Sequence, residues 1–178
     1  MSLEFAQSCI AQVPDYPIPG VTFKDVTPIA ANSAALVAVL DSIADHFKDQ
    51  SITHIAGIEA RGFIFGAALA AHLQVGFVPI RKSGKLPRET HRREYELEYG
   101  VDAIEIHTDA VCAGDRVLVI DDVLATGGTA CAAIALVEQC NASAVGLAVL
   151  LNLEFLGGAK KVAAQFPDCD VFTVFPNA

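Results

Sequence analysis

Residues 117–129 read Val-Leu-Val-Ile-Asp-Asp-Val-Leu-Ala-Thr-Gly-Gly-Thr, and this stretch decides the fold. Its four leading aliphatic residues predict a strand that is buried on both faces, as in a parallel sheet covered by helices. Asp121 and Asp122 follow at the carboxyl end of the strand, where open α/β sheets bind ligands. The glycines let the backbone approach an anion closely, and Thr129 is expected to cap a helix that begins at Ala130. A helix N-terminus carries about half a positive charge, so the stretch predicts a phosphate cradle beside two carboxylates that bind hydroxyl groups.

A purely structural role for the same residues is the main alternative. Turns rich in Gly and Thr are common between strands and helices, and an aspartate at a strand end often caps the next helix. The paired carboxylates favour a ligand site, because two adjacent like charges are costly without a partner.

Other nucleotide-binding motifs do not fit this sequence. Residues 57–62 have the spacing of a P-loop but continue with Phe63-Ile64 in place of Lys-Ser/Thr, and no GxGxxG fingerprint occurs.

Composition and charge narrow the class of protein. A chain of 178 residues is long enough for one domain with a full core, and 53% hydrophobic residues is too many for a disordered chain. The net charge of −9 argues against nucleic acid or an anionic membrane as a bulk partner. Yet six of the twelve Lys and Arg residues fall within residues 81–93. This local excess of positive charge predicts a polyanionic ligand such as a diphosphate, with a solvated charged loop as the alternative.

The five cysteines form no CxxC pair and no metal-ligand spacing. Their odd, scattered set predicts a reducing compartment, and we expect a cytoplasmic protein. The N-terminus has no basic start followed by an apolar run, so no signal peptide is expected. The longest apolar stretch, residues 62–73, is too short to span a bilayer.

Strand and helix patterns alternate along the chain, which predicts an α/β fold with a mostly parallel, twisted sheet flanked by helices. Residues 83–98 contain Gly, Pro and many charges without a clear period, so we expect a long, mobile, functional loop there. Ser33 or Asn32 is expected to cap a second helix that continues through Phe47. The expected strands are 54–58, 76–80, 101–106, 117–120, 144–151 and 171–174, and the expected helices are 3–13, 33–47, 62–73, 130–137 and 156–164.

The paired aspartates and the Ala-Thr-Gly-Gly-Thr loop resemble the signature of the type I phosphoribosyltransferases, which bind 5-phosphoribosyl-1-diphosphate. The resemblance implies the type I phosphoribosyltransferase fold in a single domain over residues 1–178. It also implies a small N-terminal hood region over about residues 1–32 and a flexible catalytic loop over about residues 83–100. It assigns the ribose hydroxyls to Asp121 and Asp122. It assigns the 5-phosphate to the five loop residues Ala125, Thr126, Gly127, Gly128 and Thr129.

Two further segments resemble the family's pyrophosphate-binding parts. Residues 59–62, Glu-Ala-Arg-Gly, match a loop that contains an unusual cis peptide, which we expect at Glu59–Ala60 or Ala60–Arg61. Residues 81–87, Arg-Lys-Ser-Gly-Lys-Leu-Pro, match the branch of the family that uses adenine. The pyrophosphate is therefore assigned to Arg61, Lys82 and Lys85.

The loop after residue 87 ends in Glu98-Tyr99-Gly100, at the spacing seen in the same branch. Glu98 and Tyr99 are the implied catalytic residues, which close over the site. Glu98 is the candidate for proton transfer at adenine N7, an effect of about 10²–10⁴-fold. The alternative for Glu98 is a loop carboxylate that only balances Arg92 or Arg93.

Residues 15–28, which run from Asp-Tyr-Pro to Val-Thr-Pro, resemble the base-binding segment of this branch. Alone, the segment would be a proline-rich surface turn. The resemblance implies that Phe23 stacks on adenine, that Thr22 and Lys24 offer main-chain contacts, and that Leu153 closes the other face of the base.

The chain departs from the family pattern at two places. Asn152 stands where Glu is usual, and residues 157–159 read Gly-Gly-Ala where Asn-Gly-Arg is usual. The first departure weakens any charge-based role near the base. The second is expected to concern packing or a subunit contact, and neither is expected to touch the phosphate sites.

The activity implied is purine salvage, in which adenine and 5-phosphoribosyl-1-diphosphate give AMP and pyrophosphate. Mg²⁺ is the implied cofactor, held mainly by substrate and water with no dedicated protein metal site, and the implied assembly is a homodimer. One alternative is a phosphoribosyltransferase for a 6-oxopurine (xanthine, hypoxanthine or guanine). Another is a non-catalytic regulator that senses the ribosyl diphosphate. The acidic net charge and the lack of a helix-turn-helix candidate disfavour the regulator, which would need to bind nucleic acid.

Overall fold

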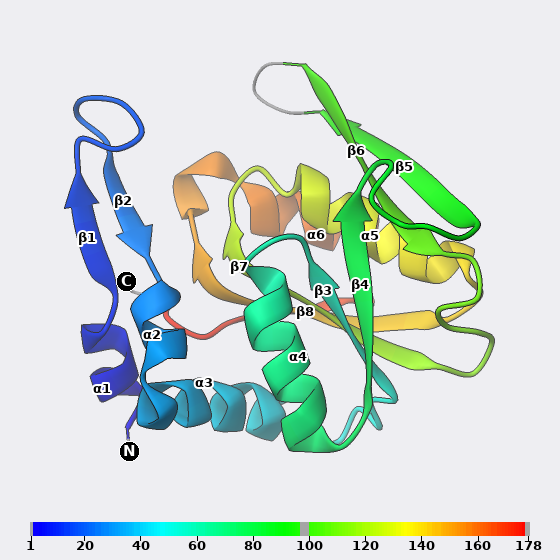
Figure 1. Cartoon of the computed structure of the whole chain (residues 1–178), viewed down its shortest axis with the longest axis horizontal. Coiled ribbons are helices and arrows are strands. Elements are labelled where there is room, and N and C mark those ends of the chain that lie inside the picture. The colour runs from blue at the N-terminus through cyan, green and yellow to red at the C-terminus, as the bar shows by residue number, and fades with distance from the viewer. Residues whose placement is uncertain (1, 97–99, 177–178) are drawn as a thin grey trace.

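Seven strands form one twisted sheet at the centre of the molecule (Figure 1). The computed structural model describes residues 2–96 and 100–176. The five strands β4, β3, β7, β8 and β9 run parallel, and β6 runs antiparallel to β4 and β5. The predicted α/β fold with a mostly parallel sheet is thereby confirmed. In spatial order the strands are β5 (Thr90–Glu96), β6 (Val101–His107), β4 (Gly76–Lys82), β3 (His54–Ile58), β7 (Arg116–Leu124), β8 (Ser143–Asn152) and β9 (Asp170–Thr173).

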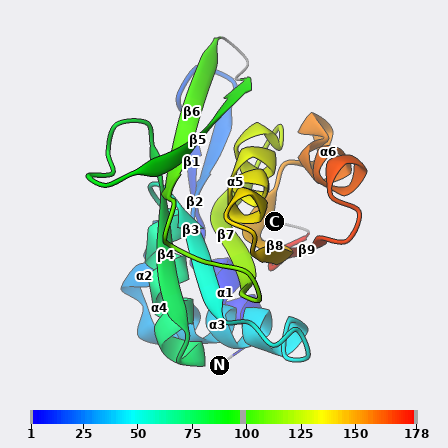
Figure 2. The same cartoon turned by 90° about the vertical axis from the view of Figure 1, so that its right-hand side faces the viewer.

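Helices cover both faces of this sheet, and Figure 2 shows them on its two sides. The helices α3 (Ser33–His46) and α4 (Gly62–Leu73) pack on one face, and α5 (Gly128–Gln139) and α6 (Gly158–Gln165) lie on the other. The central strand β7 joins the two cores. Val117 and Val119 pack in the core beneath α5, whereas Leu118 and Ile120 pack in the core beneath α3 and α4. All four side chains are fully buried, which confirms the prediction of a strand covered on both faces.

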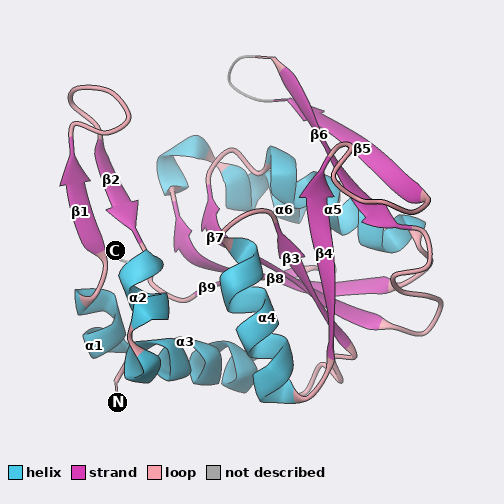
Figure 3. Cartoon of the chain, in the orientation of Figure 1, coloured by secondary structure: helices cyan, strands magenta, loops and turns pink. Residues whose placement is uncertain are grey.

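The N-terminal segment packs its helices on α3 and extends a hairpin that lies apart from the main sheet in Figure 3. It contains α1 (Leu3–Ser8), β1 (Ala11–Pro14), β2 (Thr22–Asp25) and α2 (Thr27–Ala31), with β1 and β2 paired antiparallel. The predicted helix over residues 3–13 is therefore wrong after residue 8, because the chain leaves α1 to pair with β2. The short helix α2 was not predicted. It has a proline in its first turn, where the missing N–H costs nothing.

The charged segment after β4 differs from its prediction. A long loop was expected over residues 83–98, but residues 90–96 form β5 and pair along their whole length with β6. This strand lies at the edge of the sheet and carries charged side chains, as exposed edge strands usually do. The rest of the chain follows its expected elements, with a short 3₁₀ turn η1 (Glu154–Leu156) before α6.

Asn32 caps α3, as one of the two expected capping residues, and its side-chain oxygen accepts from the N–H groups of Ala34 and Ala35, both at 3.1 Å. Within the described part of the chain, no helix combines the length and the apolar character needed to cross a membrane.

Candidate active site

Polar residues gather where β3, β4 and β7 end. In Figure 1 the arrow of β4 points toward the side on which the hairpins β1–β2 and β5–β6 rise. Because β3, β4 and β7 run parallel, their carboxyl ends meet at the same edge of the sheet. The edge therefore brings together three segments that are far apart in the sequence, around Arg61, Lys82 and Asp121.

The loop between β7 and α5 forms the predicted cradle, with one change at its helix start. Gly127 has φ +79° and precedes α5, which begins at Gly128, and the N–H of Cys131 donates to the Gly127 carbonyl at 2.9 Å. Thr129 lies within the first helical turn, so the prediction that Thr129 caps the helix is wrong. The left-handed conformation, which glycine adopts without strain, lets the chain enter the helix earlier than the sequence pattern suggests.

A small cavity of about 70 Å³ lies over this loop. Its walls are Asp121, Val123, Leu124, Ala125, Thr126, Gly127, Gly128, Thr129, Ala130 and Val149. The N–H groups of a first helical turn lack intrahelical partners and attract anions. All five loop residues assigned to the 5-phosphate thus face one cavity with one of the two ribose-assigned aspartates.

The start of α6 touches this loop through Gly158, the one residue of 157–159 that keeps the family pattern. A Cβ at Gly158 would clash with the carbonyl oxygen of Ala125 and lie 3.0 Å from the nitrogen of Gly127. In the same contact, a Cβ at Gly127 would lie 2.8 Å from the carbonyl oxygen of Gly158. The start of α6 therefore packs backbone to backbone against the phosphate loop and supports it.

The two aspartates have different surroundings. Asp122 is buried and forms an ion pair with the Nε–H of Arg61. Asp121 is half-buried, and its Oδ1 accepts from the Asp122 N–H at 2.9 Å. Burial raises the pKa of Asp121 well above its usual value, and the neighbouring charge of Asp122 raises this pKa further. A carboxyl group perturbed in this way is a candidate functional group.

Arg61 links the ribose-assigned residues to the base-assigned segment. Its guanidinium carbon lies 5.7 Å from the centre of the Phe23 ring, within range of a cation–π contact. Arg61 is held here because α4 starts close to β7. A Cβ at Gly62 would lie 2.7 Å from the carbonyl oxygen of Ile120, so only glycine fits. The expected cis peptide is confirmed between Glu59 and Ala60.

The other base-assigned residues lie at two places. Thr22 and Lys24 flank Phe23 on β2, and the Tyr16 ring packs edge-on to Phe23 at 5.4 Å. Leu153 directly follows β8, and its N–H donates to the Leu124 carbonyl at 2.8 Å. Leu153 therefore lies beside the phosphate loop, whereas Phe23 lies beside Arg61.

An ion-pair network orders the cationic segment after β4. Glu59 accepts from Arg81 Nε at 3.2 Å and Nη2 at 3.1 Å, and from the Lys82 N–H at 3.0 Å. The hydrogen bonds from Arg81 hold the pKa of Glu59 below its usual value. Arg81 also donates to the Lys85 carbonyl at 3.0 Å. The backbone that carries both pyrophosphate-assigned lysines is thus tied to the end of β3.

Glu105 on the neighbouring strand β6 also anchors this segment. It was not predicted from the sequence. This buried carboxylate on β6 accepts from the Ser83 hydroxyl at 2.6 Å and from the Gly84 N–H at 3.0 Å. The available signal was a carboxylate inside the otherwise apolar run Ala-Ile-Glu-Ile over residues 103–106. A buried carboxylate needs hydrogen-bond partners, so such a residue predicts a loop held over the strand. Glu59 was likewise passed over, although it ends an apolar strand.

Glu98 and Tyr99, the two residues expected to close the site, lie outside the described residues. The strand that leads to them packs on the phosphate loop. A Cβ at Gly128 would lie 2.9 Å from the Glu96 carbonyl oxygen and 3.4 Å from Tyr95 Cδ2.

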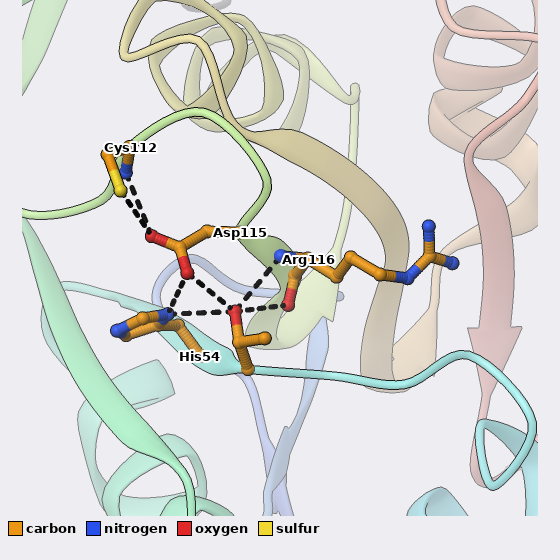
Figure 4. Close-up of polar contacts among 5 residues, drawn as sticks. His54, Cys112, Asp115 and Arg116 are labelled. Carbon is orange, nitrogen blue, oxygen red and sulfur yellow. Dashed lines mark hydrogen bonds and ion pairs between the residues drawn. The ribbon is translucent and has the colours of Figure 1, made fainter.

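A second polar cluster lies at the opposite, amino ends of β3 and β7, shown in Figure 4. Asp115 accepts from the Thr53 hydroxyl at 3.1 Å and from the Cys112 N–H at 2.9 Å, and it lies 3.4 Å from His54 Nδ1. The Thr53 hydroxyl accepts from the Arg116 N–H at 3.0 Å. A hydrogen bond with Asp115 raises the pKa of the Cys112 thiol, which lowers its reactivity. This cluster joins two strand starts and is structural.

The fold and the site define a class of protein: an α/β domain with an anion-binding loop and paired carboxylates at the carboxyl ends of its parallel strands. The sequence profile described as "Phosphoribosyl transferase domain" matches residues 25–177. An adenine phosphoribosyltransferase from Acidothermus cellulolyticus is 51% identical over 162 residues, which cover 91% of this chain and 92% of that protein.

Solved structures with a similar fold are also adenine phosphoribosyltransferases. The crystal structure of adenine phosphoribosyltransferase from Thermoanaerobacter pseudethanolicus has a TM-score of 0.90 and 44% identity, and the match covers 97% of this chain and 98% of that one. The Saccharomyces cerevisiae enzyme, solved with adenine and an imino-altritol bisphosphate, has a TM-score of 0.89, 39% identity and 97% coverage of both chains. The chain therefore belongs to the phosphoribosyltransferase family, and within it to the adenine phosphoribosyltransferases.

Proposed function

We infer that this protein transfers the 5-phosphoribosyl group of 5-phosphoribosyl-1-diphosphate to adenine, which gives AMP and pyrophosphate in purine salvage. The observation that carries the proposal is the cavity over residues 125–129, which the phosphate loop shares with Asp121. Its loop amides suit the 5-phosphate. The neighbouring carboxyl groups of Asp121 and Asp122 suit the ribose hydroxyls, because carboxyl oxygens accept hydrogen bonds from hydroxyl groups.

The cations at the ends of the neighbouring strands β3 and β4 suit the leaving group. Negative charge grows on the pyrophosphate as its bond to ribose C1 breaks, and fixed positive groups stabilise that charge. Arg61 lies beside Asp122, and the Glu59–Arg81 pair orders the backbone of Lys82 and Lys85. We assign the pyrophosphate to Arg61, Lys82 and Lys85. Holding both reactants in one orientation supplies much of the remaining rate enhancement.

Adenine is placed against Phe23. This half-buried ring lies next to Arg61, so a base stacked on it would lie beside the ribose-assigned carboxylates. Thr22 and Lys24 would read the base through their main chain, and Leu153 would close its other face. The two alternatives, a 6-oxopurine enzyme and a regulator, gain no support, because the relatives and structures compared are named for adenine.

Magnesium is the proposed cofactor. The ribosyl diphosphate and water would supply most of its oxygen ligands, with no dedicated protein metal site. A hydrated ion shared with the substrate would neutralise phosphate charge. Glu98 remains the proposed group for the adenine proton, and Tyr99 is proposed to close over the site with it.

We further propose a homodimer in the cytoplasm. The β1–β2 hairpin exposes the apolar side chains of Val13, Tyr16, Ile18 and Val21, which a second copy could cover. The five cysteines are all unpaired, which suits a reducing compartment. Sedimentation equilibrium at several protein concentrations tests the dimer.

The activity is tested by incubating the purified protein with Mg²⁺, 5-phosphoribosyl-1-diphosphate and one free base at a time. We expect nucleotide product with adenine alone, and none when Mg²⁺ is replaced by a chelator. Product from hypoxanthine, guanine or xanthine but not from adenine would identify the 6-oxopurine enzyme instead. No product with any base, together with binding of the ribosyl diphosphate, would identify the regulator.

A further inference from the structure

One carboxylate on the β5–β6 hairpin contacts two residues from different parts of the site. Asp102 on β6 lies directly opposite Tyr95 on β5 in the strand register. Its Oδ2 accepts from the Tyr95 hydroxyl at 3.2 Å and pairs with Lys82 Nζ at 3.3 Å. Its Oδ1 accepts from the Ala103 N–H at 2.8 Å, which fixes the carboxylate in orientation. Asp102 thus presents one oxygen to two donors.

The two donors belong to opposite ends of the proposed substrate site. Lys82 ends β4 and is assigned to the pyrophosphate. Tyr95 packs against Gly128, where α5 and the phosphate loop meet. Burial raises the pKa of Tyr95, so its hydroxyl stays protonated and donates. Lys82, Asp102 and Tyr95 therefore form a chain of polar contacts that links the proposed pyrophosphate region to the phosphate loop.

The bridge contributes little to the stability of the fold. The Lys82 side chain is 59% exposed, and an ion pair this open to water contributes little to stability. Asp102 itself is 29% exposed, and Tyr95 keeps its packing on Gly128 without it. The bridge sets the position of the residues at its two ends more than it stabilises the chain.

We infer that Asp102 is a positioning residue for 5-phosphoribosyl-1-diphosphate. It holds the Lys82 ammonium group at the pyrophosphate end and the Tyr95 ring at the phosphate-loop end in one fixed arrangement. Asp102 does not touch the reacting atoms. The inference rests on the proposed pyrophosphate role of Lys82.

The test is steady-state kinetics of Asp102→Asn, which keeps the shape and removes the charge. We expect the KM for the ribosyl diphosphate to rise about three- to tenfold, while the KM for adenine and kcat change by less than about twofold. The melting temperature should stay within about 2 °C, because the pair is exposed. Asp102→Glu, which keeps the charge, should recover part of the lost affinity.

Glu94→Gln is the matched control. It removes a carboxylate from the same hairpin, but one that pairs with Arg92, at 2.9 Å. Its kinetic constants should equal those of the parent enzyme.

Lys82→Ala, alone and combined with Asp102→Asn, separates this inference from the role it rests on. Because Asp102 acts partly through Lys82, Asp102→Asn should raise the KM by a smaller factor in the Lys82→Ala background than in the parent enzyme, since losses at coupled residues are not additive. A raised KM in Lys82→Ala with an unchanged or lower KM in Asp102→Asn overturns the inference and leaves the Lys82 assignment intact. An unchanged KM in Lys82→Ala overturns both, whereas the activity with adenine still stands on its own assay.

Discussion

At Gly158, the backbone at the start of α6 contacts the backbone of the phosphate loop and leaves no room for a side chain. The same holds at Gly62, which faces the backbone of β7. Both glycines act by being small, so the backbones approach more closely than any side chain allows. The consequence is that the cradle and the Arg61 loop are positioned by main-chain packing, which mutation of a neighbouring side chain would disturb little.

We predict that Gly158→Ala weakens binding of the ribosyl diphosphate. The added methyl group would clash with the Ala125 carbonyl, and backbone cannot yield as a flexible side chain does. Overpacking of this kind costs about 1–3 kcal/mol. We expect the KM for the ribosyl diphosphate to rise about fivefold or more, with a smaller change in the KM for adenine.

Ala164→Ser is the control for that variant, because it adds one atom at an exposed position of the same helix. Both should retain the helix by circular dichroism. An unchanged KM in Gly158→Ala would mean that the loop relaxes without loss of binding.

At the level of elements, the sequence predicted those that bury apolar residues, whether these recur on one helix face, as in residues 33–46, or form a continuous run, as in residues 62–73 and 117–120. The helices 33–46 and 62–73 fall where they were predicted, whereas the strand predicted at 117–120 continues to Leu124 and includes Asp121 and Asp122. The edge strand β5 could not be found in this way. Its residues are mostly exposed and charged, so it has no apolar period, and it exists because β6 supplies hydrogen-bond partners.

The site was predictable to the extent that its residues stand in short motifs. The paired aspartates and the phosphate loop face one cavity as expected, and Arg61 lies against Asp122. The supporting residues Glu59, Glu105 and Asp102 were not predicted. Each acts on a partner from another strand, and pairing between strands is set by register that a single sequence does not reveal.

The Asp115 cluster at the strand starts gives a prediction for stability alone. The Asp115 carboxylate accepts hydrogen bonds from the Cys112 N–H and the Thr53 hydroxyl, one at each oxygen. Asp115→Asn replaces one of these acceptor oxygens with an NH₂ group, which cannot accept. We expect a loss of about 1–3 kcal/mol of unfolding free energy at pH 7, measured by urea denaturation, because a part-buried donor loses its partner. Kinetic constants should not change, since the cluster lies at the far end of the strands.

The difference in unfolding free energy between the parent protein and Asp115→Asn should also depend on pH in a defined direction. Hydrogen bonds, first that from the Cys112 N–H, lower the pKa of Asp115 in the folded protein. A carboxyl group with a lowered pKa contributes its full stability above its unfolded pKa of about 3.9, and this is lost as the pH falls through the folded value. The difference between parent and variant should therefore be constant from pH 7 to about 5 and shrink below about 4. Asp49→Asn, at an exposed position, should show no such difference; a gap that persists to low pH would exclude the charge as its source.

For the whole molecule, the site draws on the N-terminal unit, three strand ends, the β5–β6 hairpin and two helix starts. A ligand that contacts these parts together binds the folded chain and not the unfolded one. Its binding energy is then added to the stability of the whole fold.

We predict that the ribosyl diphosphate with Mg²⁺ raises the melting temperature. At about 100 times its Kd, a ligand adds about 2.7 kcal/mol, and one kcal/mol shifts the melting temperature of a chain of this size by about 2–4 °C. Differential scanning calorimetry should therefore show a rise of roughly 5–10 °C. Asp122→Asn should lose most of this rise, since it removes a ribose-assigned carboxylate and frees Arg61. Asp115→Asn should melt at a lower temperature but keep the full rise, because its cluster lies away from the cavity. A full rise in Asp122→Asn would remove Asp122 from the ribose site, and no rise in the parent protein would contradict the proposed ligand.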